Sequence, residues 1–346
     1  MFNHKTTALA TTALAAVLAI TVAGPSEGSS TVPISACGQT VTTNAVLTKD
    51  LTCAGSNGIN VAAAGITIDL KGFTISGDLS PGHSGIDDSG GYDGLAVKNG
   101  VLRNFAIGMF AFNSADHVSL SNLAASGNIA YGIYIGGASA SVKSSTVAGN
   151  AKGVQVDGDS ATVQSLTASR NSGPGILING DSAKIQSSTA AGNGATGIVA
   201  NGASGSISSS TASGNSANGI MAVGAAASVK SSTASGNGQT GMTVGGASAS
   251  VKSSTASGNG QTGIVASGAS VSVSSSTASG NMIIGITVSG DAAVITGDRA
   301  ETNGFFGGSD LKGFGIYATG YTTAPIGANV VRGNDDPSGC QPASLC

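Results

Sequence analysis

The feature that most constrains this chain is a repeat with a spacing of 22 residues. Self-similarity at a fixed period of this length is typical of solenoids, in which each repeat forms one coil and stacked coils bury a continuous core. The sequence therefore predicts a stack of coils. Close copies of one segment each end in an asparagine, and these asparagines are Asn193, Asn215, Asn237, Asn259, Asn281 and Asn303.

Composition indicates which kind of solenoid this is. Leucine-rich repeats need several leucines per unit, whereas these units consist mainly of Val, Ile, Ser, Thr, Gly and Ala. Two or three glycines per unit would each cost a helix about 1 kcal/mol, and β-branched residues favour strands. Apolar residues alternate over short runs and recur in columns, as half-buried strands require. One column is Ile133, Val154, Ile176, Ile198, Ile220, Met242, Ile264 and Ile286, and another is Val142, Val163, Ile185, Ile207, Val229, Val251, Val273 and Ile295.

We therefore expect an all-β parallel β-helix of roughly a dozen coils with about 22 residues per coil. Asn tolerates the left-handed conformation at a tight corner, and its amide can both donate and accept hydrogen bonds. Stacked asparagines are thus predicted to form a structural ladder from coil to coil, and a glycine column predicts a second corner with positive φ. The ladder is Asn193, Asn215, Asn237, Asn259 and Asn281, and the glycine column is Gly180, Gly202, Gly224, Gly246, Gly268 and Gly290.

Both ends of the chain differ from the repeats. Residues 1–23 have the basic flank, apolar run and small final residues of a secretory signal peptide, and the run is short for an uncleaved membrane anchor. We expect an N-terminal segment and cap over 24–64, the parallel β-helix over 65–334 and a cysteine-bearing tail over 335–346. The protein is accordingly expected to be secreted, periplasmic or at the cell surface, and not an integral membrane protein.

The four cysteines all lie outside the repeats. Local disulfides, Cys37 with Cys53 and Cys340 with Cys346, fit an exported protein with stapled ends, although four cysteines permit three connectivities. Metal ligation is the alternative, but the short C-x-x-C spacing is missing and no metal site is expected. The net charge is −3 and the chain has no basic run, so nucleic acid is not an expected partner.

Three stretches of the sequence carry a family resemblance. They are C-G-Q-T-V-T-T-N-A-V-L-T-K-D-L-T-C from Cys37, G-I-T-I-D-L-K-G-F-T-I-S-G from Gly65, and the later V-x-S-S-T-A-S-G-N units. Together they resemble secreted bacterial right-handed parallel β-helix proteins, which share the pectate-lyase-like fold. This resemblance implies a right-handed helix with stapled caps, but it implies no single reaction, because the family includes lyases, hydrolases, epimerases and surface proteins. Of the polygalacturonase-like motifs N-T-D, D-D, G-H-G and R-I-K, only Asp87-Asp88 is matched, and the epimerase-like D-P-H is missing.

The densest set of titratable residues gives weak catalytic candidates: His83, Asp87, Asp88 and Asp93. These carboxylates could bind Ca²⁺ or act as an acid and base on a sugar, and the alternative is a solvated turn. An enzyme with this site would also draw on Lys98, Arg103, Asp116 and His117. Aromatic residues gather in the same early coils and are missing from the middle ones, so a sugar-binding groove is expected towards an end of the stack.

Hydroxyl side chains give a second set of candidates. Around each inward Ala of a T-A-S triplet, Thr and Ser should face outward about 7 Å apart, repeating at about 4.8 Å. Such an array resembles the surfaces of ice-binding β-solenoids, and the alternative is an ordinary exposed strand face. The residues chosen are Thr211, Ser213, Thr233, Ser235, Thr255 and Ser257.

The sequence as a whole favours a secreted or cell-surface solenoid with a binding or structural role and no catalysis. A polysaccharide or cell-surface polymer is the expected partner, and no cofactor is expected, with Ca²⁺ as the alternative. One alternative is a polysaccharide lyase, glycoside hydrolase or epimerase of the same fold, and a second is ice binding by the Thr-Ala-Ser columns.

Overall fold

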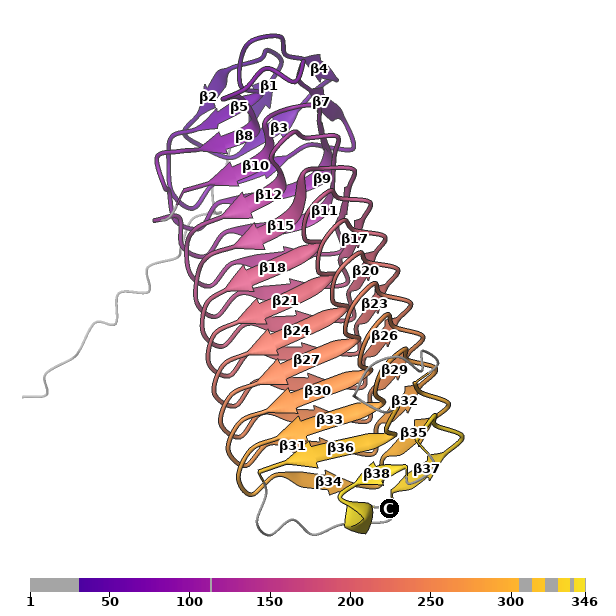
Figure 1. Ribbon diagram of the computed structural model, residues 1–346. Coiled ribbons are helices and arrows are strands. Elements are labelled where there is room, and N and C mark those ends of the chain that lie inside the picture. Colours follow the sequence, from indigo (N-terminus) through magenta and orange to yellow (C-terminus); the bar gives the residue numbers. More distant parts are fainter. Residues whose placement is uncertain (1–30, 113, 305–312, 321–328, 337–338, 346) are drawn as a thin grey trace, which may run out of the picture. The chain divides into compact units, whose positions relative to one another are not determined.

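The computed structural model describes residues 31–112, 114–304, 313–320, 329–336 and 339–345, all within one compact unit, Thr31–Cys346 (Figure 1). Apart from one 3-10 turn, η1 (Ala343–Leu345), every element in these ranges is a strand, and these strands pair in parallel. The strands form three ladders that run along the stack. Each regular coil contributes one strand to each ladder.

The first ladder is a 14-stranded sheet. It consists of β2 (Gln39–Val41), β5 (Ile59–Val61), β8 (Ser84–Asp88), β10 (Ile107–Ala111), β12 (Tyr131–Ile135), β15 (Lys152–Val156), β18 (Ile176–Asn179), β21 (Ile198–Asn201), β24 (Ile220–Val223), β27 (Met242–Gly245), β30 (Ile264–Ser267), β33 (Ile286–Ser289), β36 (Ile316–Thr319) and β38 (Cys340–Gln341).

The other two ladders join into a 24-stranded sheet, because the long strands β9 (Ala96–Arg103) and β11 (Ser119–Ser126) belong to both. The second ladder continues with β1 (Val32–Ile34), β3 (Ala45–Leu47), β6 (Thr67–Asp69), β13 (Ser141–Lys143), β16 (Thr162–Gln164), β19 (Lys184–Gln186), β22 (Ser206–Ser208), β25 (Ser228–Lys230), β28 (Ser250–Lys252), β31 (Ser272–Ser274) and β34 (Val294–Thr296). The third has β4 (Leu51–Thr52), β7 (Thr74–Ser76), β14 (Thr146–Ala148), β17 (Thr167–Ser169), β20 (Thr189–Ala191), β23 (Thr211–Ser213), β26 (Thr233–Ser235), β29 (Thr255–Ser257), β32 (Thr277–Ser279), β35 (Arg299–Glu301) and β37 (Val330–Arg332).

The predicted fold is confirmed: the unit is an all-β, right-handed parallel solenoid of about 13 turns with about 22 residues per turn. The ladders begin at Val32, inside the range 24–64 that the sequence assigns to an N-terminal segment and cap. The predicted signal peptide, residues 1–23, lies outside the described residues. No helix in the described ranges has the length and apolar character needed to cross a membrane.

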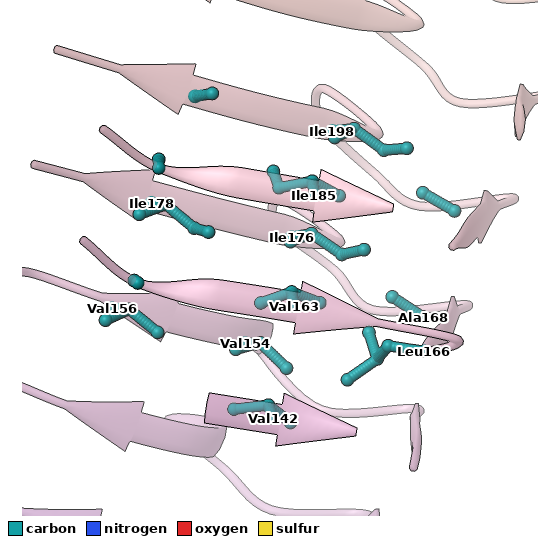
Figure 2. Packing of buried hydrophobic residues seen from close by; sticks show 14 of the residues in the cluster. Val142, Val154, Val156, Val163, Leu166, Ala168, Ile176, Ile178, Ile185 and Ile198 are labelled. Carbon is teal, nitrogen blue, oxygen red and sulfur yellow. The ribbon is translucent and has the colours of Figure 1, made fainter. Parts of the chain in front are cut away.

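The core is the interior of the coils. Figure 2 shows inward side chains such as Val154, Ile176 and Ile198 lying in register in successive coils, and all three are at most 1% exposed. Full burial of each such side chain contributes about 1.5–3 kcal/mol relative to leaving it in water. Most of this area is covered by the next coil, so the stack is stable only as a stack.

The asparagine column forms a buried hydrogen-bonded ladder. Asn215 donates its side-chain amide to Asn237 Oδ1 (2.9 Å) and to the Ala190 carbonyl (3.1 Å), and its backbone N–H donates to the same Oδ1 (3.1 Å). Each amide thus satisfies groups on two neighbouring coils, and the bonds repeat at a separation of 22 residues. The column runs through Asn128, Asn150, Asn171, Asn193, Asn215, Asn237, Asn259, Asn281, Asn303 and Asn334.

Of the two backbone expectations, the left-handed asparagine was wrong and the positive φ of the glycine column is confirmed at five of its six positions. The left-handed residue at this corner is the one before each ladder asparagine, a glycine such as Gly236 (φ 61°) in most coils and Arg170 (φ 52°) or Thr302 (φ 51°) in two of them, because the asparagine itself turns its side chain inward to the ladder. The same register places Asn104 (φ 58°) at the left-handed position and Phe105 at the ladder position. At the predicted glycine corner, φ is positive from Gly202 (134°) to Gly290 (142°) but not at Gly180, and a Cβ at Gly202 would also collide with the carbonyl oxygen of Gly180 one coil earlier. Close approach of two backbones therefore requires that glycine.

A second buried ladder consists of serines and was not predicted. Ser210 donates its backbone N–H to Ser232 Oγ (3.2 Å), and the Ser232 hydroxyl donates to the Lys230 carbonyl (2.9 Å). The pattern repeats from Ser188 to Ser276 and passes to Asp298, whose Oδ1 accepts from the Ser276 N–H at 2.7 Å. This ladder closes the corner between the second and third ladders.

The N-terminal end is stapled by a disulfide between Cys37 and Cys53. Cys340 is also disulfide-bonded, and its expected partner, Cys346, lies outside the described residues.

Candidate functional site

The four titratable candidates of the early coils do not converge. Asp87 and Asp88 are neighbours in β8, so their side chains point to opposite faces of the sheet. Asp87 faces outward and is partly exposed, whereas Asp88 faces the interior and is fully buried. Asp93 lies exposed at the next corner, where its Oδ1 accepts the backbone N–H of Asp116 (2.9 Å). His83 is half-buried just before β8.

Asp88 has the environment of a structural residue. Its Oδ1 accepts the backbone N–H of Tyr92 at 3.0 Å, which closes the turn after β8, and its Oδ2 has no hydrogen-bond partner. Burial raises the pKa of Asp88 to about 6, aided by the neighbouring carboxylates of Asp87 and Asp93. Burial also raises the pKa of Asp87, although Ser89 Oγ (3.1 Å) and Asn57 Nδ2 (3.0 Å) donate to its carboxylate.

Outward from this sheet, next to Asp87, lies an aromatic patch that we define as Phe110, Phe112, Tyr131 and Tyr134. Strand pairing aligns Phe110 with Asp87 on one side and with Tyr134 on the other. The Phe110 and Tyr134 rings stack with centroids 5.8 Å apart, and Tyr131 meets Tyr134 edge-on at 5.2 Å. Phe112, whose ring centroid is 6.3 Å from that of Phe110, is 47% exposed. These rings form one aromatic surface across β10 and β12.

The coils that follow carry a polar row, defined as Gln155, Asp157, Asn179 and Asn201. The Gln155 amide donates to Asp157 Oδ2 at 2.7 Å, the Asn179 amide donates to Asp157 Oδ1 at 2.7 Å, and the Asn201 amide donates to Asn179 Oδ1 at 3.0 Å. The row is therefore preorganised by its own hydrogen bonds. It extends the outer face of the 14-stranded sheet from β15 to β21.

Two side chains, Tyr134 and Lys152, connect the polar row to the aromatic patch. The hydroxyl of Tyr134 is hydrogen-bonded to Asp157, and burial together with this anion raises the pKa of Tyr134 to about 12. The ammonium of Lys152 lies 4.9 Å from the centre of the Tyr131 ring, 3.2 Å from the Tyr131 hydroxyl and 3.4 Å from Gln155 Oε1. Aromatic faces beside ordered amides and hydroxyls are chemically suited to bind sugars.

The hydroxyl candidates lie on the third ladder, away from the aromatic patch. Thr211, Thr233 and Thr255 are in register and partly exposed, with the inward alanines between the Thr and Ser columns fully buried. Ser213, Ser235 and Ser257 form the second outward column. The threonine column extends beyond these three residues in both directions and comprises Thr146, Thr167, Thr189, Thr211, Thr233, Thr255 and Thr277.

A groove of about 560 Å³ near the N-terminal end is lined by Asn44, Asp69, Lys71 and Lys98, among others. Asp69 Oδ2 lies 3.2 Å from Lys71 Nζ and 3.8 Å from Lys98 Nζ, so these charged side chains of the groove already pair with one another. Arg103 is exposed in the same sheet, at the end of β9, and His117 is exposed at a corner next to Asp116. Within the described residues no group of three or more His, Cys, Asp or Glu side chains is placed to hold a metal ion.

The aromatic signal that marks this face was visible in the sequence, where Phe110, Phe112, Tyr131 and Tyr134 cluster. The polar row was not recognised, because Gln155, Asn179 and Asn201 belong to no catalytic motif. The strand register pairs Asn179 with Asn201, and the carboxylate of Asp157 connects Gln155 to Asn179.

Residues 174–336 match the family model described as right handed beta helix region. Comparison with curated proteins finds no match. Among solved structures, the chain is similar to the periplasmic alginate epimerase AlgG (11% identity, TM-score 0.56, covering 86% of this chain and 76% of that one). It is also similar to the Azotobacter vinelandii mannuronan C-5 epimerase AlgE4 A-module (11%, 0.50, 86% and 90%) and to the Dettilon tailspike protein (14%, 0.52, 80% and 62%). At these identities the likeness shows a shared right-handed β-helix fold.

Proposed function

We propose that this right-handed β-helix protein binds a polysaccharide along the outer face of its 14-stranded sheet, without catalysis. The observation that carries the proposal is the aromatic patch joined to the polar row by Tyr134 and Lys152. From β8 to β21 this face crosses five strand spacings, or about 24 Å, which is long enough for several sugar rings. Two of the solved structures with this fold are named as epimerases of alginate or mannuronan, which are polysaccharides.

The spacing of the carboxylates argues against glycoside hydrolysis. Asp87 in β8 and Asp157 after β15 are three strands apart, which corresponds to about 14 Å. Glycosidases place their two carboxyl groups about 5–9.5 Å apart. Asp88 is nearer to Asp87 in sequence but faces the interior of the coil. A binding face therefore accounts for these residues better than a pair of catalytic acids.

We also propose that the protein is exported from the cytoplasm. The disulfide between Cys37 and Cys53 and the bonded state of Cys340 fit an oxidising compartment. Residues 1–23 carry the signal-peptide pattern. A secreted, periplasmic or surface-bound protein would meet polysaccharide there. Mass spectrometry of the N-terminus from an exported fraction tests this, and an intact Met1 in a protein that stays in the cell would contradict it.

The binding test uses affinity gel electrophoresis of the mature protein against a panel of polysaccharides. The double variant Tyr131→Ala/Tyr134→Ala should weaken binding at least tenfold, because one aromatic contact with a ligand contributes about 1 kcal/mol or more. A matched control, Thr233→Ala/Thr255→Ala on the third ladder, should bind as the parent does. Equal losses in both variants, or release of unsaturated or reducing ends by the parent, would contradict a non-catalytic site on this face.

The threonine column supports ice binding as a second candidate function. Seven threonines are in register beside a column of serines that Ala148 and Ala191 interrupt, and they give a hydroxyl and methyl array on one narrow face. Thr233→Tyr and Thr255→Tyr should abolish ice shaping if this face binds ice. Ice shaping that survives both substitutions, or that the parent lacks, would remove this candidate.

A further inference from the structure

We infer that the polysaccharide bound by the aromatic patch is uncharged, a neutral glycan and not a polyuronate; this inference rests on the proposed function. The charge of the ligand matters because the two epimerases reported above are named for uronate polymers, alginate and mannuronan. A site for such polymers needs cations placed along the chain of carboxylates. The described residues of this face instead include more carboxylates than cations.

The outer face itself carries two carboxylates and one cation. Asp87 lies on one side of the rings and Asp157 on the other, each with a partly exposed side chain. The cation, Lys152, is already engaged with the Tyr131 ring, the Tyr131 hydroxyl and Gln155 Oε1. An anionic ligand would have to displace these contacts to reach the ammonium.

A column of further acids lines the edge of the same sheet, at the corner that follows its strands. Asp93 Oδ1 accepts the N–H of Asp116 (2.9 Å), and Asp116 Oδ1 accepts the N–H of Ala138 (2.7 Å). The bonds resume where Asp159 Oδ1 accepts the N–H of Asp181 (2.8 Å) and Asp181 Oδ1 accepts the N–H of Ala203 (2.7 Å). These four carboxylates are fixed beside the face from coil to coil and give it a negative potential.

The opposite edge does not cancel this charge. Arg170 occupies one left-handed corner there, in the column whose other members, Gly127, Gly149 and Gly192, carry no charge. Arg103 is exposed at the end of β9, directly before the same corner in an earlier coil, so a polyuronate lying along the face would meet six carboxylates against three cations. A neutral glycan would meet aromatic rings and the amides of the polar row, which can both donate to and accept from hydroxyl groups.

The test measures affinities of the full-length mature protein for neutral glucomannan and xyloglucan and for polygalacturonate and alginate, each with EDTA and with Ca²⁺. We expect at least one neutral glycan to bind tenfold or more tightly than either polyuronate, with little dependence on salt. Asp159→Asn/Asp181→Asn should leave neutral binding unchanged and raise polyuronate binding, because it removes two like charges.

The outcomes separate the two claims. Polyuronate binding equal to or tighter than neutral binding, with or without Ca²⁺, and lost in Tyr131→Ala/Tyr134→Ala, would overturn this inference and leave the proposed function intact. No binding to any polymer, or binding that the tyrosine variant does not weaken, would instead contradict the proposed function.

Discussion

Single residues at the corners set how tightly the coils can stack. In most coils a glycine with φ near 60° precedes the ladder asparagine, and at Gly236 no atom lies within 4 Å of where a Cβ would be. Gly241 has an ordinary φ, but a Cβ there would lie 2.6 Å from both Asn259 Nδ2 and the Gly263 carbonyl. One glycine is required by conformation and the other by packing.

These two glycines should therefore respond differently to the same change. Gly236→Ala should lower the free energy of unfolding by about 1 kcal/mol, the cost of an L-residue in the left-handed region. Gly241→Ala should cost several times more, because the colliding atoms belong to the backbone and to the buried ladder. Urea unfolding checks the order, with Lys230→Ala on the exposed face as control. Equal effects at both glycines would contradict the packing described here.

A buried carboxyl gives the protein a pH-dependent stability. Asp298 is 1% exposed, its Oδ2 has no partner, and burial raises its pKa to about 7. The folded chain therefore holds this proton more tightly than the unfolded chain, and stability that is full below about pH 4 is lost as the pH rises through about 7. Asp298→Asn should raise the free energy of unfolding at pH 8 by a few kcal/mol and flatten its pH dependence, whereas Asp291→Asn on the surface should not. A variant no more stable than the parent at pH 8 would show that the site is hydrated.

At the level of elements, the asparagine and serine side-chain ladders and the paired strands all stabilise each coil. The 22-residue period makes the asparagine column and both apolar columns recognisable in the sequence, so the strands and the coil repeat could be predicted. The serine ladder could not, because Ser also fills exposed positions: Ser231, directly before the buried Ser232, is exposed and has φ of 50°. The left-handed residue in each Gly-Asn pair was ambiguous because both types tolerate that conformation.

Removing one rung from each ladder tests their relative weight. Asn237→Ala leaves the backbone and side-chain N–H groups of Asn215 without their acceptor, and should cost about 3 kcal/mol or more. Ser232→Ala removes one acceptor for the Ser210 N–H and should cost about 1–2 kcal/mol. Ser231→Ala, at the neighbouring exposed position, is the control. Thermal unfolding of the three variants would contradict this order if Ser232→Ala were the most damaging.

At the scale of the whole unit, contacts join each coil mainly to its two neighbours, as expected for a one-dimensional stack. The Cys37–Cys53 disulfide lies in the first coils, so its loss should act locally. Reduction should speed amide exchange in β1 to β5 and leave β21 to β30 protected. Hydrogen exchange with mass spectrometry checks this, and uniform loss of protection along the chain would indicate a single cooperative unit instead.

The candidate site could be predicted only in part. Clustered aromatics placed it in the early coils, and strand alternation alone would have separated Asp87 from Asp88. The polar row arises because Asp157, Asn179 and Asn201, each 22 residues from the next, become neighbours in space, so these residues carry no signal until the register of each coil is known.

Binding of polysaccharide to the aromatic patch can be observed by hydroxyl-radical footprinting of the full chain with saturating neutral glycan. Tyr317 is a control within the molecule, because it lies on the same outer face of the same sheet in β36. We predict that oxidation of Phe112, Tyr131 and Tyr134 falls severalfold while that of Tyr317 is unchanged. Unaltered oxidation of the patch when the glycan is bound, or protection of Tyr317 alone, would contradict the account.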